Sequence, residues 1–228
     1  MENWSALDPK QVVEEGYDFI AERHHEFAQT TRVDERARYV SVLLDALPAG
    51  VAVLDLGCGA GVPTTQALAR RFKVTGVDIS ERQIELARRN VPEAEFIRAD
   101  ITRLDFPPAS FDGMAAFYSL IHVPREELGK LFQNIASWLR PGGLLVATLG
   151  TRSVARDFDD DFMGARMFWS SFDSATNRRL LEEAGLRIIR VQEETELEFG
   201  APIKFLWVVA EKPGEQRWQG KSIRDCHG

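Results

Sequence analysis

The sequence predicts an α/β protein with a doubly wound, mostly parallel sheet of seven strands whose last strand is antiparallel. Three observations support this prediction. Apolar segments of strand length alternate with helical periodicity up to residue 150, a glycine-rich turn joins the first such strand to a helix, and two apolar segments close the chain with only a turn between them. Strands that alternate with helices form parallel sheets with right-handed crossovers, whereas two strands joined by a short turn pair antiparallel.

Each element follows from its local pattern. Residues 10–29 and 34–47 carry apolar residues at three- and four-residue spacing, which predicts two helices before the first strand. Further along, strands are expected at 51–57, 73–80, 94–100, 111–119, 142–150, 187–197 and 203–212, and helices at 63–72, 81–90, 125–139 and 174–186. Ser80 is placed to cap the helix that follows it with its hydroxyl.

The chain has 228 residues, of which 44% are hydrophobic and 28% charged, as in an ordinary globular protein. We expect a single domain over residues 1–212. Within it, residues 1–48 would form covering helices, and residues 151–173 an irregular insertion that acts as a lid. Residues 213–228 lack periodicity and are rich in glycine and charge, so we expect a disordered tail there.

Charge and composition exclude several classes of function. The net charge of −7 comes with no block of Lys and Arg, so a nucleic-acid partner is not expected. The polar start and the lack of an apolar run of about 20 residues argue against a membrane protein and favour the cytoplasm. Cys58 and Cys226 lack the spacing of a zinc or disulfide site, and no metal site is expected. No sequence signal points to an oligomeric state.

The segment VLDLGCGAG, residues 53–61, carries glycines at alternate positions directly after a strand. A dinucleotide site would have the spacing G-x-G-x-x-G and would bind a pyrophosphate at the helix N-terminus. Here Gly57, Gly59 and Gly61 have the spacing G-x-G-x-G, and Asp55 stands two residues before the first glycine. Its carboxylate would repel phosphate and suits an ammonium group.

Two more carboxylates follow at the ends of the next two strands. Asp78 is placed to accept hydrogen bonds from both hydroxyls of a ribose. The carboxylate of Asp100 is placed to accept from an adenine amino group, while the backbone N–H of Ile101 donates to the ring. Ligands of such sheets lie outside the carboxyl ends of the strands. Three acids at adjacent strand ends therefore match an amino acid, a ribose and an adenine in line.

With these residues the sequence resembles the class I S-adenosylmethionine-dependent methyltransferases over about residues 10–212. The matching pieces, in the order and spacing of that family, are VLDLGCGAG, VTGVDIS, FIRADI, LDFPPASFDGMAAFYSLIHV and LRPGGLLVATLG. The resemblance implies a Rossmann-like methyltransferase fold, S-adenosylmethionine as cofactor and a small-molecule methyl acceptor as partner.

The resemblance also implies roles for individual residues. Asp55, Gly57 and Gly59 would face the methionine part of the cofactor, and Ile79 one face of the adenine. The segment YDFIAERHHEF is similar to the family's YDxxAxxY helix, in which the first Tyr covers the cofactor, although its last position here is His24. The cofactor-binding candidates are thus Tyr17, Asp55, Gly57, Cys58, Gly59, Gly61, Asp78, Ile79, Asp100, Ile101 and Tyr118, with a packing role expected for Cys58.

Histidine is the side chain best suited to take a proton from an acceptor near neutral pH. His122 directly follows the fourth strand, at the cofactor end of the sheet, and either faces the acceptor as a general base or supports the loop structurally. His24, on the covering helix, is the second catalytic candidate.

The acceptor site is indicated by composition. The sequence lacks the Asn/Asp-Pro-Pro-Tyr signature of amino-group methyltransferases that act on nucleobases or glutamine. Residues 158–173 concentrate aromatic and methionine side chains in a segment where a loop would be polar. We expect Met163, Met167, Phe168 and Trp169 to form an acceptor wall, the alternative being a short helix that covers the core.

These observations together predict methyl transfer to an O, N or C atom of a small, partly apolar or aromatic metabolite. A cofactor-binding protein without catalysis, acting as a partner or regulatory subunit, is the alternative. The glycine spacing and Asp55 disfavour a nicotinamide-dependent oxidoreductase.

Overall fold

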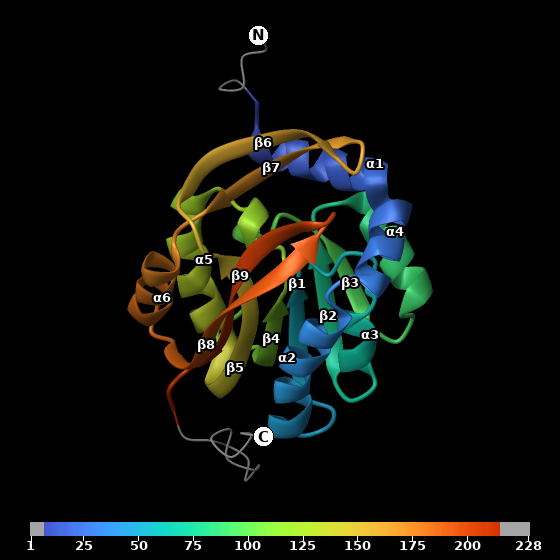
Figure 1. Cartoon of the computed structure of the whole chain (residues 1–228). Helices are drawn as coiled ribbons and strands as arrows, with labels where there is room; N and C mark the ends of the chain where they lie inside the picture. Colours follow the sequence, from blue (N-terminus) through green and yellow to red (C-terminus); the bar gives the residue numbers. More distant parts are fainter. Residues whose placement is uncertain (1–6, 215–228) are drawn as a thin grey trace.

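The computed structural model describes residues 7–214. Its centre is a seven-stranded sheet with the strand order β3-β2-β1-β4-β5-β9-β8 (Figure 1). The strands are β1 (Ala52–Leu56), β2 (Lys73–Asp78), β3 (Glu95–Arg98), β4 (Phe111–Ala116), β5 (Leu139–Gly150), β8 (Arg187–Glu198) and β9 (Ala201–Glu211). Strands β1 to β5 pair in parallel, and β9 pairs antiparallel with both β5 and β8. Only the last strand therefore runs against the others, as predicted.

Helices cover both faces of this sheet. They are α1 (Pro9–Thr30), α2 (Val33–Ala46), α3 (Thr64–Ala69), α4 (Glu81–Asn90), α5 (Arg125–Trp138) and α6 (Ser174–Glu183), with short 3₁₀ turns η2 (Ile101–Arg103) and η3 (Leu120–His122). Leu43 of α2 and Leu68 of α3 belong to the core on one face. Phe132 of α5 and Leu181 of α6 belong to the core on the other.

Helix α1 lies across the carboxyl ends of the strands, where it covers the end of the sheet (Figure 1). It begins at Pro9, a favoured first residue, and the side chain of Asp8 caps it by accepting a hydrogen bond from the backbone N–H of Lys10 at 3.0 Å. Ser80 caps α4 as predicted, because its Oγ accepts from the backbone N–H of Gln83 at 3.1 Å.

The insertion after β5 differs from its prediction. Residues 151–173 contain a β-hairpin of β6 (Val154–Phe162) and β7 (Ala165–Ser171), so both the irregular loop and the alternative short helix were wrong. Met163 and Gly164 join the strands with φ values of +56° and +87°, as in a type I′ turn. The hairpin packs on α1, where a cluster of apolar side chains joins the two elements.

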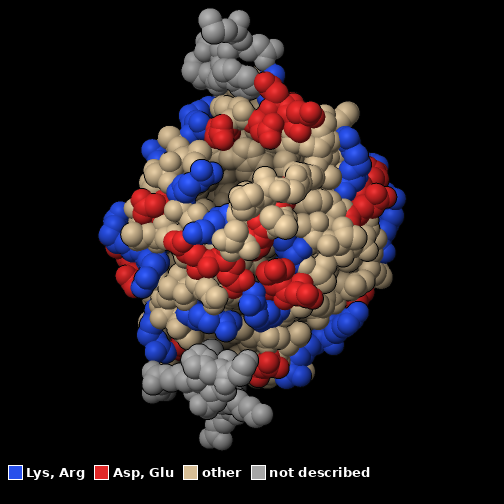
Figure 2. Space-filling model, in the orientation of Figure 1, with Lys and Arg blue, Asp and Glu red and all other residues tan. Residues whose placement is uncertain are grey.

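On the face drawn in Figure 2, acidic and basic side chains are interspersed, and neither sign of charge covers the whole face. Within residues 7–214, no helix has both the length and the apolar character needed to cross a bilayer. Of the disordered tail predicted for residues 213–228, all but the first two residues lie outside the described part of the chain, and so does Cys226.

Candidate functional site

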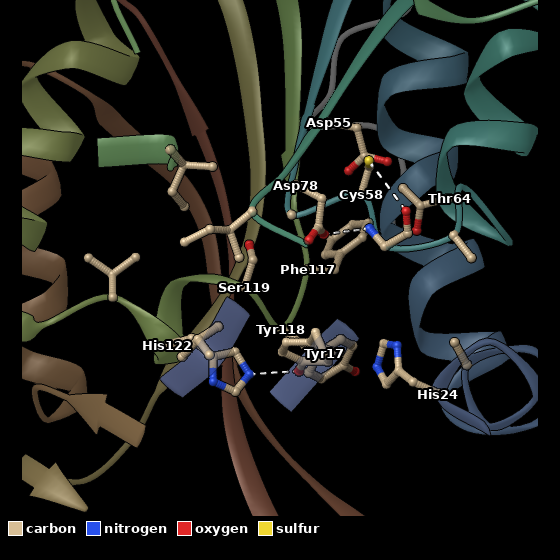
Figure 3. A pocket seen from close by; sticks show the side chains of 18 of the residues that line it. Tyr17, His24, Asp55, Cys58, Thr64, Asp78, Phe117, Tyr118, Ser119 and His122 are labelled. Atoms are coloured by element: carbon tan, nitrogen blue, oxygen red, sulfur yellow. Dashed lines mark hydrogen bonds between the residues drawn. The ribbon is translucent and has the colours of Figure 1, made fainter. Parts of the chain in front are cut away.

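A cavity lies at the carboxyl ends of the parallel strands, and its lining includes Tyr17 and His24 of α1 (Figure 3). It brings together most of the residues predicted for the site, although they come from five separate segments. Those that line it are Tyr17, His24, Asp55, Gly57, Cys58, Gly59, Asp78, Ile79, Asp100, Ile101, Tyr118 and His122.

The three glycines of the loop after β1 all have positive φ, but each meets a different surface. A Cβ on Gly57 would stand 2.2 Å from the Cβ of Ser119, so this glycine allows two strand ends to approach. Gly61 packs on Val91 after α4, away from the cavity, where the sequence predicted a cofactor contact. At Gly59 a Cβ would be in ordinary van der Waals contact with Gln83 Oε1 at 3.7 Å, so no protein atom crowds this position.

The strand-end carboxylates of Asp55 and Asp78 are buried side by side along this loop. Burial raises the pKa of Asp55 to about 7, although the Thr65 hydroxyl donates a hydrogen bond to it at 2.6 Å. Burial also raises the pKa of Asp78 to about 6, against backbone N–H donors of Ser80 at 3.0 Å and Gly59 at 2.8 Å. Both carboxylates would be stabilised in ionised form by a ligand that brings a cation or hydroxyl donors.

The third carboxylate, Asp100, already has a cationic partner, which the sequence did not predict. Lys10 Nζ of α1 lies 2.9 Å from Asp100 Oδ2 and also donates to Thr102 Oγ1 at 2.7 Å and Glu127 Oε2 at 2.6 Å. Burial would raise the pKa of Asp100, but the hydrogen bonds from Lys10 and Thr102 hold it below its usual value. A ligand amino group at this position would share Asp100 with Lys10.

Cys58 is a packing residue, as predicted. Its side chain lies in an apolar cluster with Ile84, Ala87 and Phe96. Burial raises the pKa of the thiol well above its usual value, so the sulfur stays protonated and unreactive.

His122 is held from both sides. A carbonyl only accepts, so Nδ1 carries the proton and donates to the backbone oxygen of Phe168 at 2.8 Å. Nε2 then accepts a hydrogen bond from the hydroxyl of Tyr17 at 2.8 Å (Figure 3). Burial lowers the pKa of His122 to about 4 and raises that of Tyr17. The pair is therefore neutral at pH 7, and it places a phenolic oxygen on the cavity wall.

His24 lines the cavity on the other side of Tyr17, with the two ring centres 4.9 Å apart. Its Nδ1 lies 3.3 Å from the amide nitrogen of Gln83, which can only donate. Burial, and then the nearby charge of Arg36, lower the pKa of His24 to about 3. His24 is thus a neutral neighbour of Tyr17 with one hydrogen bond of its own.

None of the four residues predicted as an acceptor wall lines the cavity. Met167 and Phe168 have no exposed surface, because they fill the core between the hairpin and α1. Met163 lies in the hairpin turn. Trp169 is half-buried, and its ring centre is 4.4 Å from that of His122. The hairpin thus reaches the site through the Phe168 carbonyl and the Trp169 ring, both of which contact His122.

Lys10 and Arg36 line the cavity but were missed from the sequence. Each is a single basic residue on a covering helix, outside every matched motif. Only the packing of α1 and α2 over the strand ends brings them to the cavity.

Comparisons with known proteins agree with this geometry. Residues 53–143 match a family model described as a methyltransferase domain. The chain is 37% identical to the O-methyltransferase cnsE of Penicillium expansum, over 70% of this chain and 60% of that protein. It is 39% identical to 27-O-demethylrifamycin SV methyltransferase of Amycolatopsis mediterranei, over 51% of this chain and 43% of that protein. The chain therefore spans about half the length of these relatives.

A solved structure shares the fold. Magnesium protoporphyrin IX methyltransferase of Synechocystis PCC 6803, with bound S-adenosylmethionine, superposes with a TM-score of 0.67 at 21% identity, over 92% of this chain and 100% of that one.

Proposed function

The chain belongs to the class I S-adenosylmethionine-dependent methyltransferase family, and on this premise we propose that it transfers a methyl group from S-adenosylmethionine to an oxygen atom of a small, partly apolar acceptor. One observation supports the proposal above all others. A single cavity joins the buried carboxylates of Asp55 and Asp78 to the hydrogen-bonded pair of Tyr17 and His122.

The residues present fit the cofactor. Asp55, whose pKa is raised to about 7 by burial, would hold the ammonium group. Asp78 would accept from the ribose hydroxyls, and Asp100 and Ile101 would meet the adenine edge. No protein atom crowds the backbone at Gly59. This leaves room for the part of the cofactor that joins its ammonium group to its ribose. When bound, S-adenosylmethionine supplies an electrophilic methyl group on a positively charged sulfur.

In this proposal the chain's own contribution is to orient the acceptor, exclude water and move one proton. Tyr17 Oη accepts a hydrogen bond from the acceptor hydroxyl while it donates to His122 Nε2. As the methyl carbon leaves sulfur and bonds to the acceptor oxygen, the proton of that oxygen would pass to Tyr17 Oη and the proton of Tyr17 to His122 Nε2, and the cofactor would leave as a neutral thioether. Tyr17 ends neutral and His122 ends as imidazolium. His122 acts through Tyr17 and does not itself face the acceptor.

The low pKa of His122 is compatible with this step. A pKa of about 4 keeps Nε2 unprotonated, and so able to accept, across the neutral range. The acceptor oxygen becomes strongly acidic as it gains the methyl group, so a weak base is sufficient to take its proton.

Two observations support the choice of acceptor. The names of both curated relatives given above refer to O-methylation or an O-demethylated substrate. Apolar side chains from three segments line the cavity beside the polar ones, as expected for an acceptor with an apolar part; they include Val13, Phe117 and Val123.

The proposal is tested with tritiated S-adenosylmethionine and a panel of hydroxylated small molecules, each beside its O-methylated counterpart. We expect label in at least one free hydroxyl compound and none in its methylated counterpart. Label that enters the methylated counterpart equally would move the reaction to N or C. If the protein binds the cofactor but transfers label to none of the compounds, the result would contradict O-methylation of small hydroxylated acceptors.

A further inference from the structure

A second groove lies between the first half of α1 and the ends of β2 and β3. It shares three lining residues with the strand-end cavity, which are Lys10, Ile79 and Asp100. These residues form the boundary between the two spaces. They also surround the proposed adenine position, because Ile79 would face the ring and Asp100 its amino group. The groove therefore begins where the adenine of the cofactor would end.

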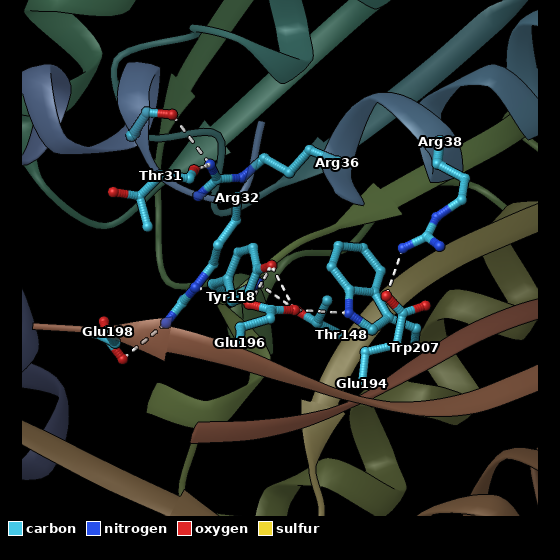
Figure 4. Close-up of polar contacts among 11 residues, drawn as sticks. Thr31, Arg32, Arg36, Arg38, Tyr118, Thr148, Glu194, Glu196, Glu198 and Trp207 are labelled. Carbon is cyan, nitrogen blue, oxygen red and sulfur yellow. Dashed lines mark hydrogen bonds and ion pairs between the residues drawn. The ribbon is translucent and has the colours of Figure 1, made fainter. Parts of the chain in front are cut away.

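Helix α1, which forms one wall of the groove, is held at both ends. Near its start, Lys10 Nζ lies 2.9 Å from Asp100 Oδ2. Just beyond its end, Arg32 pairs with Glu196 and Glu198 of β8, both at 2.8 Å (Figure 4). The position of this wall is therefore set by the fold itself, and the groove does not need a ligand to form it.

The carboxylate of Asp100 has one oxygen left for an adenine amino group. Its Oδ1 accepts from the backbone N–H and the hydroxyl of Thr102, both at 2.9 Å. Its Oδ2 faces the cations Lys10 at 2.9 Å and Arg103 at 3.6 Å. An adenine amino group has two N–H donors, and one bond to Oδ2 uses one of them. The second N–H would then lie at the boundary with the groove, where a substituent can replace it.

The groove is polar, and acidic side chains predominate in it. Five of its lining residues are acidic and three are basic. One of the basic residues, Arg98 of β3, already pairs with Glu14 of α1 across the groove. A positively charged substituent would therefore meet a more favourable field in the groove than a negatively charged one.

We propose that this groove binds a positively charged substituent on the adenine amino nitrogen of an S-adenosyl ligand. The assignment rests on the proposed function, since it takes the adenine to lie at Asp100. It extends the ligands of this protein to S-adenosyl compounds with one chain on that nitrogen. Two substituents on the nitrogen would remove the N–H that Asp100 accepts, so such compounds are excluded.

Calorimetric titration of the wild-type protein with four ligands tests the proposal. They are S-adenosylhomocysteine and three derivatives whose adenine amino nitrogen carries an aminohexyl chain, a carboxypentyl chain or two methyl groups. We expect the aminohexyl derivative to bind within about threefold of S-adenosylhomocysteine and about two- to fivefold more tightly than the carboxypentyl derivative. The dimethyl derivative should bind at least about tenfold more weakly than S-adenosylhomocysteine, because it loses a hydrogen bond to a charged group.

Two variants of exposed residues on α1 locate the chain of the aminohexyl derivative. Gln11 lines the groove, whereas Gln29, near the other end of the helix, does not. Gln11→Trp should narrow the groove and lower the affinity for the aminohexyl derivative, relative to S-adenosylhomocysteine, by at least about fivefold. Gln29→Trp should keep the wild-type ratio. If Gln11→Trp does not fold, Glu15→Trp replaces it, since Glu15 is another exposed residue of the groove.

Four results overturn the proposal. The aminohexyl chain could weaken binding by more than about threefold, which would show that the groove is blocked. The dimethyl derivative could bind as tightly as S-adenosylhomocysteine, which would place the amino group away from Asp100. The carboxypentyl derivative could bind as tightly as the aminohexyl one, or the ratio could stay unchanged in Gln11→Trp, and either would place the chain elsewhere. If S-adenosylhomocysteine does not bind at all, the proposed function fails, and this assignment fails with it.

Discussion

At the scale of single residues, the hydroxyl of Tyr17 is the atom on which the proposed proton transfer depends. Tyr17→Phe keeps the ring that covers the cofactor site and removes only the contact with His122 Nε2. General acid–base help is worth typically about 10²- to 10⁴-fold in rate, so kcat should fall at least about tenfold. The affinity for S-adenosylhomocysteine should stay within about twofold of wild type.

His122→Asn provides the second half of this test. It should lower kcat about as much as Tyr17→Phe, and the double variant should lose little more, because residues that act as a unit are not additive. Steady-state kinetics of the three variants measures this. Full turnover in Tyr17→Phe would show that the acceptor loses its proton by another route.

Also at this scale, the buried carboxylates should make cofactor binding depend on pH. Burial raises the pKa of Asp55 to about 7 and of Asp78 to about 6, and a bound ammonium or ribose hydroxyl favours the ionised forms. Below these pKa values a proton must leave before the ligand binds. Affinity for S-adenosylhomocysteine should therefore be flat above about pH 8 and fall on acidification, by up to about tenfold per pH unit for each group.

His122 and His24 do not titrate within this pH range, since their pKa values lie at about 4 and about 3. Calorimetry from about pH 8.5 to about pH 5.5 follows the affinity, and buffers of different ionisation enthalpy count the protons released. Tighter binding at the acidic end would contradict the assignment of Asp55 and Asp78 to the site.

At the scale of elements, the packing of the β6–β7 hairpin on α1 holds His122 in place. Gly16 makes this approach possible, because a Cβ there would stand 2.6 Å from the backbone oxygen of Arg166. Gly16→Ala should destabilise the protein by about 1–3 kcal/mol through overpacking, although alanine is the better helix former. Gly129→Ala in α5 is the control, since its Cβ would meet only Leu180 Cδ2 at 3.7 Å.

Thermal denaturation of the two variants distinguishes overpacking at Gly16 from the general effect of replacing a helical glycine by alanine. Gly129→Ala should be neutral or stabilising by up to about 1 kcal/mol. A stabilised Gly16→Ala would mean that α1 and the hairpin are free to move apart.

The same elements show how far the sequence could predict the fold. Strands β1 to β5 were predictable because they are apolar runs that alternate with helices of clear periodicity, and β8 and β9 because only a turn separates two apolar-rich segments. Strand β7 was not, because Met167 and Phe168 are consecutive and both buried, which breaks the alternation expected of a half-buried strand. Its turn, Met163–Gly164, is also not the Asn-Gly or Asp-Gly pair that marks most type I′ hairpins.

The residues of the site also fall into those that the sequence could predict and those that it could not. Asp55, Asp78 and Asp100 were predictable because strand ends converge in a parallel sheet whatever the details of packing. Lys10 and Arg36 were not, because their positions depend on how the covering helices dock. The role of His122 was left open for the same reason, since its partner Tyr17 lies 105 residues away in the sequence.

At the scale of the whole molecule, a ligand that binds across four strand ends and α1 should stabilise the entire fold. S-adenosylhomocysteine at about 100 times its Kd adds about 2.7 kcal/mol by mass action. For a domain of this size that corresponds to a rise in Tm of about 5–10 °C. NAD at the same concentration should leave Tm unchanged, because its pyrophosphate would meet Asp55 next to the glycine loop. An equal rise with NAD would favour a dinucleotide site.

Whether the strand-end cavity is the cofactor site is tested most directly by calorimetric titration of S-adenosylhomocysteine into the wild-type protein and Asp78→Asn, with the exposed Asp105→Asn as control. A hydrogen bond to a charged group is worth about 1.5–3 kcal/mol, so Asp78→Asn should weaken binding about tenfold to a hundredfold while Asp105→Asn binds like wild type. Unchanged affinity in Asp78→Asn, or no binding to the wild-type protein, would contradict the claim.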